Sequence, residues 1–233
     1  MKLFLVSNST LHGQGYLEHC AAAMQAFLGP KVRRVLFVPY ALLDRDGYHA
    51  KAKARFEAMG LQLDSVHHAA DPRAAAAEAQ AFFVGGGNTF RLLAELRRQG
   101  LIPAIRAAVA AGTPYMGSSA GSNVACATIM TTNDMPIVDP GGFDALGLVP
   151  FQINPHYLDP TPGSTHMGET REERLRQYHE DNARAVVGLR EGAWLRVEAG
   201  EVRLEGATGA RLFFAGKTPL EMLPPSRLEL PLG

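Results

Sequence analysis

Short runs of consecutive apolar residues alternate along this chain with segments of helical spacing, and this order limits the possible folds more than any other feature. The first apolar runs cover residues 3–6, 35–38, 61–66, 81–84 and 113–116. The helical segments cover residues 16–28, a charged, alanine-rich stretch that ends near 60, 72–79, 88–96 and 103–110. Continuous apolar strands between helices are typical of a parallel sheet that is covered on both faces. The sequence therefore predicts an α/β fold with a mostly parallel sheet and helices on both faces.

The last third of the chain has a different pattern. Residues 186–189 form one more apolar run, whereas apolar and polar residues alternate over 194–197 and 202–204, around Ala199-Gly200. Alternation on both sides of a glycine-containing turn predicts an antiparallel β-hairpin. We expect this C-terminal hairpin to be a sheet edge or a small appendage, so that residues 1–233 form a single α/β domain.

Composition and the N-terminal sequence narrow the possible functions. The chain has 23 Lys and Arg against 23 Asp and Glu, whereas nucleic-acid-binding proteins carry a basic excess. Its two cysteines, Cys20 and Cys126, have no disulfide or zinc-type spacing. The apolar run at the N-terminus ends at Ser7, which is too short for a signal peptide or a membrane span. These observations predict a cytoplasmic protein with no nucleic-acid or membrane partner.

Two glycine-rich stretches follow predicted strands, at the sheet edge where parallel sheets bind ligands. Residues 117–121 (GSSAG) have the G-x-S-x-G spacing of a nucleophile elbow, a sharp turn that points the serine hydroxyl out of the sheet. Ser119 is therefore the candidate nucleophile, and the N–H of Ala120 is expected to face an oxyanion. A second N–H is expected from Gly86 or Gly87 in the other stretch. Glycines after strands also serve turns alone, so the motif by itself leaves a structural role open.

A nucleophilic serine requires a general base. His156 follows a strand-like run that ends at Pro155, and a rigid backbone of this kind suits a base. The alternative for His156 is a histidine that caps the end of a strand. The other seven histidines lie in polar or helical stretches and are interpreted as surface residues.

The acid that orients the histidine stays open from spacing alone. Asp134, Asp139 and Asp144 lie between the serine and His156, which would give the chain order of the α/β-hydrolases. Glu191 lies just after the apolar run 186–189, and this position at the end of a predicted strand favours it.

Cofactor motifs in the chain are incomplete. A dinucleotide fingerprint that begins at Gly85 would need glycine or alanine where the chain has Phe90. A P-loop that ends at Lys217-Thr218 would need glycine where the chain has Arg211. The adjacent His67 and His68 have no further ligand at a metal-binding spacing. The sequence therefore predicts no metal and no nucleotide or other cofactor.

Six sequence blocks, spread over most of the chain, form a specific set. They are residues 85–90 (GGGNTF), 119–123 (SAGSN), 131–138 (TTNDMPIV), 152–156 (QINPH), 168–172 (GETRE) and 191–194 (EGAW). In these blocks the chain resembles serine peptidase family S51, the family of the α-aspartyl dipeptidases (the peptidase E group). The resemblance implies metal-independent hydrolysis of dipeptides with N-terminal aspartate. It also implies a fold related to the class I glutamine amidotransferases, with serine in place of cysteine at the elbow.

The resemblance also implies roles for individual residues. Ser119 matches the nucleophile, His156 the base, Glu191 the acid that orients the base, and Asp134 an acidic residue that supports the site. The family is associated with homodimers, so the expected partners are a small peptide substrate and a second copy of the chain. One residue departs from the bacterial pattern, because Ser118 stands where a tryptophan is expected, and this predicts a wider site or altered packing.

Arg171 and Arg174 are candidates for recognition of the substrate carboxylate, which arginine can bind through two parallel hydrogen bonds. They lie three residues apart at a predicted helix start, and the alternative is a solvated, salt-bridged helix face. The resemblance favours Arg171 as a substrate-binding residue, and Asn88 is a second candidate.

Three other functions stay open from the sequence. The first is a cyanophycinase-like β-aspartyl peptidase, which a comparison of substrates would separate. The second is an α/β-hydrolase esterase, whose acid would lie upstream of His156. The third is a non-catalytic binding module of amidotransferase-like fold, which labelling of Ser119 by an acylating reagent would exclude.

Overall fold

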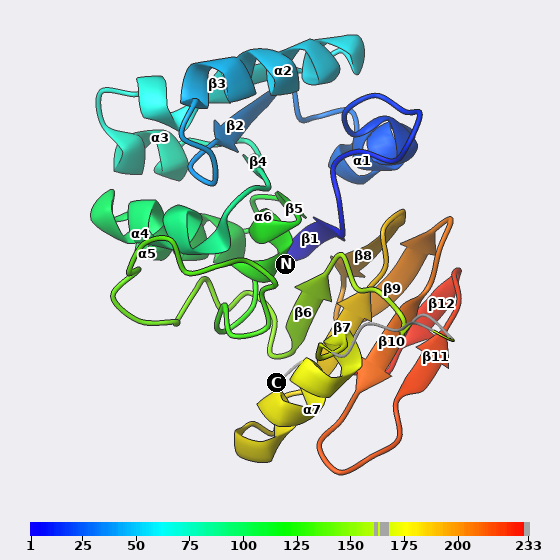
Figure 1. The fold of residues 1–233 in the computed structure, drawn as a ribbon. Coiled ribbons are helices and arrows are strands. Elements are labelled where there is room, and N and C mark those ends of the chain that lie inside the picture. The colour runs from blue at the N-terminus through cyan, green and yellow to red at the C-terminus, as the bar shows by residue number, and fades with distance from the viewer. Residues whose placement is uncertain (161–162, 164–167, 231–233) are drawn as a thin grey trace.

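The computed structural model describes residues 1–160, 163 and 168–230, and its helices flank two β-sheets (Figure 1). The larger sheet has eight strands in the order β12-β9-β8-β1-β5-β4-β2-β3. Its parallel half consists of β1 (Lys2–Val6), β2 (Arg34–Val38), β3 (Gln62–Ser65), β4 (Phe82–Val84) and β5 (Tyr115–Ser118). These strands coincide with the first five apolar runs, so the α/β prediction is confirmed.

The C-terminal strands make the architecture mixed rather than mostly parallel. The large sheet is extended in antiparallel pairing by β8 (Ala193–Glu198), β9 (Glu201–Gly206) and β12 (Ser226–Leu228). The second sheet contains β6 (Gln152–Pro155), β7 (Val186–Leu189), β10 (Ala210–Phe213) and β11 (Leu220–Met222). Only β6 and β7 run parallel in the second sheet as described. Strands β10 to β12 are short and contain charged residues, so no apolar run indicated them.

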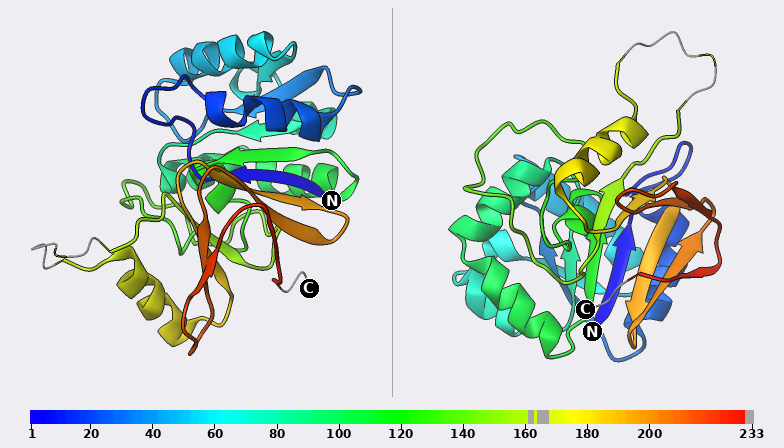
Figure 2. Two further views of the ribbon diagram at one scale, coloured as in Figure 1. Left: turned by 90° about the vertical axis from the view of Figure 1, so that its right-hand side faces the viewer. Right: turned by 90° about the horizontal axis from the view of Figure 1, so that it is seen from below.

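Helices cover both faces of the large sheet (Figure 2). Side chains that alternate along the strands point into a hydrophobic core on each face. One face packs against α1 (Ala21–Leu28) and α2 (Arg45–Ala58), and the other packs against α3 (Pro72–Ala77), α4 (Thr89–Arg98) and α5 (Leu101–Ala110). On β1, Phe4 and Val6 belong to the first core, whereas Leu3 and Leu5 belong to the second, as the two-residue period of a strand requires.

The remaining helices lie near the second sheet and at the end of β5. The helix α7 (Arg171–Asp181) stands beside the second sheet in Figure 1, where Leu175 packs with Tyr157 and Phe213. The single-turn helix α6 (Ala120–Asn123) follows β5 directly. In the described residues, no helix combines the length and the apolarity needed to cross a bilayer.

Parallel strands end at a common edge, and this edge carries the sequence blocks of interest. The carboxyl end of β4 leads to Gly85, and that of β5 leads to Ser119. The strands β6 and β7 of the second sheet end beside them and lead to His156 and to Arg190-Glu191. The fold therefore brings residues from four separate loops into one place.

Candidate active site

The turn between β5 and α6 has the geometry of a nucleophile elbow. Ser119 has φ 53° and ψ −110°, a backbone conformation that residues other than glycine rarely adopt. A Cβ at position 117 would lie 2.5 Å from the carbonyl oxygen of Gly121, and a Cβ at position 121 would collide with the carbonyl oxygen of Val84. Both glycines are therefore required for the chain to turn this tightly beside β4.

Ser119, His156 and Glu191 form a continuous chain of hydrogen bonds. The Oγ of Ser119 lies 2.9 Å from Nε2 of His156, and Nδ1 of His156 lies 2.6 Å from Oε1 of Glu191. These contacts fit the tautomer in which Nδ1–H donates to the carboxylate and Nε2 accepts from the serine hydroxyl. The side chains of His156 and Glu191 are 41% and 48% exposed, so the chain of hydrogen bonds is open to solvent.

Three residues that the sequence did not indicate hold the backbone next to His156 and Glu191. The Ser7 hydroxyl donates to the carbonyl of Leu189 at 2.8 Å and accepts from the N–H of His156 at 2.9 Å. Asn8 accepts from the N–H of Gly192 at 2.8 Å, and the Thr208 hydroxyl donates to the carbonyl of Glu191 at 2.6 Å. Because these side chains act on backbone groups far away in the sequence, no local motif marks them.

The glycine loop after β4 lies against Ser119. A Cβ at position 86 would lie 3.0 Å from the Cβ of Ser119 and 3.6 Å from its Oγ. Gly87 has φ +133°, and a Cβ there would lie 2.7 Å from the carbonyl oxygen of Ala41. The absence of side chains at Gly86 and Gly87 therefore lets the backbone of this loop approach the Ser119 hydroxyl.

Tyr48 of α2 packs against this loop. A Cβ at position 85 would collide with its hydroxyl, which accepts a hydrogen bond from the Tyr16 hydroxyl at 3.2 Å. Burial raises the pKa of Tyr48, so the phenol is neutral at pH 7.

On the other side of Ser119, the N–H of Ala120 begins α6 and has no acceptor within that helix.

Asp134 lies in the site, but its carboxylate does not orient His156. Its Oδ2 accepts from the N–H and the hydroxyl of Thr89, at 2.7 and 2.6 Å, and from the hydroxyl of Thr132 at 3.2 Å. Asp134 thus holds the N-terminus of α4, where a negative charge is favourable. Of the other acids considered, Asp139 accepts from the N–H of Gly141. The carboxylate that contacts the histidine ring is therefore that of Glu191.

A pocket of about 620 Å³ opens onto Ser119 and His156. Its walls include two carboxylates, Asp44 and Asp134, and the ammonium group of Lys51. Pockets of this size hold small organic ligands. The pocket therefore offers groups of both charges to a small zwitterionic molecule next to the nucleophile.

Asn88 forms two hydrogen bonds at the start of α4. Its Oδ1 accepts from the N–H of Arg91 at 3.0 Å, so the side chain caps α4. Its Nδ2 donates to the carbonyl of Met135 at 2.9 Å. The amide of Asn88 therefore ties α4 to the loop around residue 135, and its contact with substrate stays a prediction.

Arg171 is the first residue of α7 and is half-buried. Burial lowers the pKa of its guanidinium group, Arg174 adds to this effect, and the Asp134 carboxylate opposes it. Arg174 pairs with Glu169 at 3.7 Å, whereas Arg171 forms no ion pair within the part of the chain that the structure describes. Arg171 is not among the described residues that line the pocket, and its link to the pocket is its electrostatic interaction with Asp134, which lines it.

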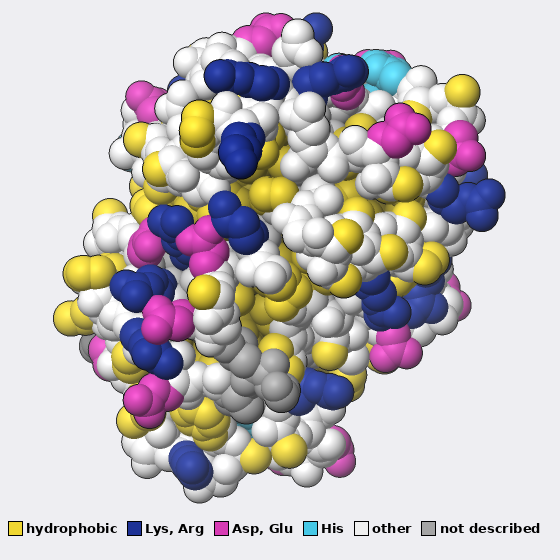
Figure 3. Space-filling model, turned by 180° about the vertical axis from the view of Figure 1, so that it is seen from behind, with side chains coloured by type: hydrophobic (Ala, Val, Ile, Leu, Met, Phe, Trp, Pro, Cys, Tyr) yellow, Lys and Arg dark blue, Asp and Glu magenta, His cyan; other side chains and the backbone are white. Residues whose placement is uncertain are grey.

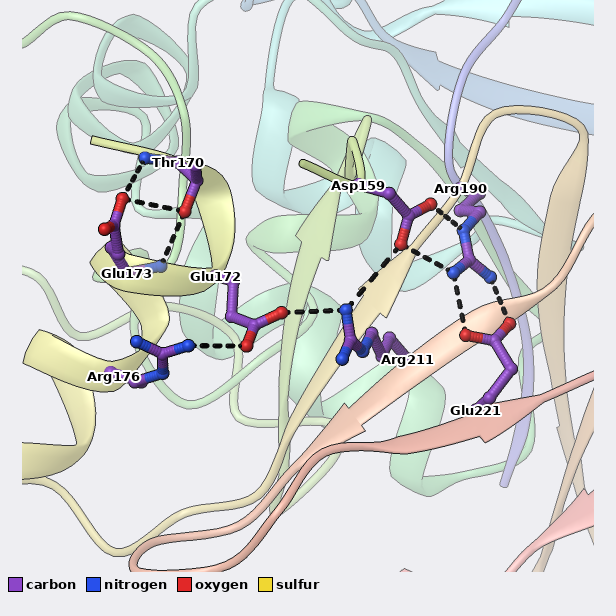
Figure 4. A network of polar contacts seen from close by, with 8 residues as sticks. All are labelled: Asp159, Thr170, Glu172, Glu173, Arg176, Arg190, Arg211 and Glu221. Atoms are coloured by element: carbon purple, nitrogen blue, oxygen red, sulfur yellow. Dashed lines mark hydrogen bonds and ion pairs between the residues drawn. The ribbon is translucent and has the colours of Figure 1, made fainter. Parts of the chain in front are cut away.

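Ion pairs behind the site connect the strand that leads to Glu191 with the segment after His156 (Figure 4). Arg190 binds Asp159 through two hydrogen bonds, at 2.7 and 2.8 Å, and also binds Glu221 of β11. These two carboxylates raise the pKa of Arg190. The bidentate geometry on both sides of one guanidinium fixes the end of β7 immediately before Glu191.

The same network continues to α7 (Figure 4). Arg211 of β10 lies 3.9 Å from Asp159 and 2.7 Å from Glu172, which is buried, and Arg176 also binds Glu172 at 2.7 Å. Glu172 is the neighbour of Arg171 on α7. The network therefore holds the first turn of α7 in a fixed position relative to the loop that carries the histidine.

Ser118, which stands where a tryptophan is expected, is fully buried on β5 and packs within the sheet. It is not among the described residues that line the pocket, so of the two predicted effects the structure supports altered packing rather than a wider site. Its hydroxyl has no hydrogen-bond partner among the described residues.

Comparisons with known proteins point to one family. The sequence model of peptidase family S51 matches residues 3–205. Peptidase E of Streptomyces coelicolor is 56% identical over 222 residues, which are 95% of this chain and 91% of that protein. A probable alpha-aspartyl dipeptidase of Drosophila melanogaster is 49% identical over 224 residues, which are 95% of this chain and 93% of that protein. The solved structure of a peptidase from an acI-B1 actinobacterium aligns with a TM-score of 0.68 at 14% sequence identity. The alignment covers 98% of this chain and 94% of that chain, which shows a similar fold.

Proposed function

This chain belongs to peptidase family S51, as its sequence blocks predicted, and we propose that it is a serine dipeptidase that hydrolyses dipeptides with N-terminal aspartate. The observation that carries the proposal is the hydrogen-bonded chain from Ser119 through His156 to Glu191, at the mouth of a pocket lined by charged groups. The names of the relatives, peptidase E and probable alpha-aspartyl dipeptidase, support the substrate class.

The proposed reaction is acyl transfer through a covalent intermediate. His156 accepts the proton of the Ser119 hydroxyl at Nε2 while Oγ attacks the carbonyl carbon of the aspartyl residue, and Glu191 stabilises the charged imidazole. His156 then gives the proton to the leaving amine as the peptide bond breaks. Water, deprotonated by the same imidazole, hydrolyses the aspartyl ester and frees Ser119.

Two backbone N–H groups are proposed to bind the oxyanion of the tetrahedral intermediate. The N–H of Ala120 has no acceptor in its helix and follows the nucleophile directly. Gly86 and Gly87, whose loop lies against Ser119, are the candidates for the second donor. Each donor of this kind contributes about 10²–10³ to the rate.

The charges around the pocket suit an aspartyl dipeptide. A carboxylate in the substrate requires a fixed cation, and Arg171 is a partly desolvated cation that interacts electrostatically with Asp134, which lines the pocket. The substrate ammonium group requires an anion, and Asp134 is an acceptor on the pocket wall. We therefore assign the aspartate side chain to Arg171 and the ammonium group to the surroundings of Asp134.

We also propose the finer features that the resemblance implies. A serine elbow at the edge of a parallel half-sheet supports a fold related to the class I glutamine amidotransferases. The exposure of His156 and Glu191 is compatible with a homodimer whose interface lies near the active site.

Arg171→Met is expected to lower kcat/KM for Asp-Leu by about 10²–10³, because the substrate carboxylate would be buried without its partner. Arg174→Met is the matched control, since Arg174 lies on the same helix face but pairs with Glu169, and it should stay within about twofold of the wild type. The measurement is steady-state kinetics on Asp-Leu and Leu-Leu. Equal losses in both variants would remove Arg171 from substrate recognition.

Ser7→Ala is expected to lower the free energy of unfolding by about 1–3 kcal/mol, because a buried N–H and a buried carbonyl lose one shared partner. It should also slow turnover by about 10–10²-fold, since the backbone of the base is no longer held. Thermal unfolding and kcat are measured together. Ser118→Ala is the control, because it removes a buried hydroxyl that has no partner in the described chain. Wild-type turnover by Ser7→Ala would show that Ser7 does not position His156.

The proposed function is tested by hydrolysis of Asp-Leu beside Leu-Leu, β-Asp-Leu and a simple ester. We expect rapid cleavage of Asp-Leu and slow or undetectable cleavage of the other three. Preference for β-Asp-Leu would instead indicate a β-aspartyl peptidase, and preference for the ester would indicate an esterase. No hydrolysis of any substrate by a folded preparation would favour a binding module.

A further inference from the structure

Three metal-ligating side chains converge outside the active site, at the start of α2. Oδ1 of Asp46 lies 3.0 Å from Nε2 of His67 and 2.8 Å from Nε2 of His68, and all three atoms lie within 4.8 Å of one another. The two histidines have no further ligand at a metal-binding spacing in the sequence, because Asp46 lies 21 residues before His67 and only the fold brings it near.

We propose that Asp46, His67 and His68 bind one divalent transition-metal ion, with Zn²⁺ as the representative ligand. Two imidazoles and one carboxylate form a donor set that zinc and similar ions prefer. Zinc bound to nitrogen and oxygen at about 2.0–2.2 Å in a tetrahedron requires ligand atoms about 3.3–3.6 Å apart. The observed separations of 2.8 and 3.0 Å need to open by about 0.3–0.8 Å to admit the ion.

A second hydrogen bond orients one of the proposed ligands. Nδ1 of His67 lies 2.6 Å from the Ser65 hydroxyl, which leaves Nε2 directed at Asp46. Histidines that bind metals usually have their other ring nitrogen held in this way.

The cluster has a buried side and an open side. The side chain of His67 is 10% exposed, whereas those of His68 and Asp46 are 53% and 83% exposed. The cluster borders a hollow of about 470 Å³ that includes His49, Ser65 and His68 in its walls. Figure 3 shows histidine side chains at the surface, next to acidic ones, at the end of the molecule where α2 and β3 lie. An ion can therefore reach the ligands from solvent, and water can complete its coordination.

The position of Asp46 on α2 gives the proposed site a structural consequence. Gly47, Tyr48 and Lys51 of the same helix line the active-site pocket, whereas Asp46 contacts the histidines of the 3₁₀ helix Val66–His68. A metal ion would join these two elements at the first turn of α2. Binding is therefore expected to raise the melting temperature of the folded chain.

The alternative is a hydrogen-bonded cluster that holds no metal, and titration calorimetry separates the two. Metal-free protein, prepared with a chelator, is titrated with ZnCl₂ in a non-coordinating buffer, and its melting temperature is followed in parallel. We expect one ion per chain and a higher melting temperature. Asp46→Asn and His68→Ala, both at exposed positions, should each weaken binding by at least about tenfold, and Ser65→Ala by about 10–100-fold.

Two controls make the result specific. His12→Ala removes an exposed histidine outside the cluster and should bind Zn²⁺ like the wild type. His156→Ala removes the active-site imidazole, and unchanged binding in this variant would place the ion away from Ser119. The proposal is overturned if the wild type binds no Zn²⁺, or if Asp46→Asn and His68→Ala bind it as tightly as the wild type does.

Discussion

Ser119→Ala is expected to reduce the turnover of Asp-Leu by about 10⁶, the loss seen when a serine that acts together with a histidine base is removed. The reason is chemical, because the oxygen that forms the acyl-enzyme disappears while the pocket and the oxyanion donors stay. Binding should change little, since the hydroxyl is half-exposed and contacts only His156 among the described side chains. The measurements are the turnover rate on Asp-Leu and a thermal melt.

Ser118→Ala is the matched control for this experiment. It changes the adjacent serine, which is buried, does not line the described pocket, and has no hydrogen-bond partner in the described chain. We expect it to keep the activity and the melting temperature of the wild type within error. Appreciable activity in a clean Ser119→Ala preparation would contradict the assignment of the nucleophile.

Glu191→Gln has the second-largest expected effect, a loss of turnover by about 10⁴-fold. The carboxylate accepts a hydrogen bond from Nδ1–H of His156, and an amide can present its own N–H there instead. The imidazole would then favour the tautomer whose Nε2 carries a proton and cannot accept one from Ser119. The pH dependence of kcat/KM, measured for the wild type and the variant, reports this change in the base.

Asp134→Asn provides the comparison with the other acid that the sequence left open. Its carboxylate binds Thr89 and Thr132 and faces the pocket, so its loss should raise KM more than it lowers kcat. If Asp134→Asn instead lost turnover by about 10⁴-fold while Glu191→Gln stayed near wild type, the two roles would be reversed.

The sequence located the main chemical groups because each follows a strand end that its apolar run predicts. Ser119, His156 and Glu191 are separated by 37 and 35 residues, yet each is the first or second residue after a short buried strand. Ser119 follows a strand of the large sheet, whereas His156 and Glu191 follow the two parallel strands of the second sheet, and the fold brings these strand ends together. The resemblance to the family selected Glu191 among the candidate acids, and the contact of Glu191 with the His156 ring agrees with that choice.

Other parts of the site depend on tertiary contacts that carry no local pattern. Ser7 and Thr208 act on backbone groups across the fold, and Tyr48 of α2 lies against Gly85. Asn88, which follows three glycines, is a predicted substrate ligand. In the structure it is the cap of α4, a role that an asparagine before a helix also predicts.

The second sheet was the main feature of the fold that the sequence did not predict. Its strands β10 and β11 have four and three residues, and each contains a charged residue, Arg211 or Glu221. These charges belong to the ion-pair network around Arg190 and Asp159. The homodimer and the cytoplasmic location stay predictions.

The most direct test of the central claim is to capture the acyl-enzyme. The protein is mixed with excess Asp-Leu, quenched in acid within the first turnovers, digested and analysed by mass spectrometry. We expect one aspartyl group on the peptide that contains Ser119, and more of it in Glu191→Gln if deacylation slows most. An unmodified Ser119 throughout rapid hydrolysis of Asp-Leu, or an aspartyl group on another residue, would contradict the proposed mechanism.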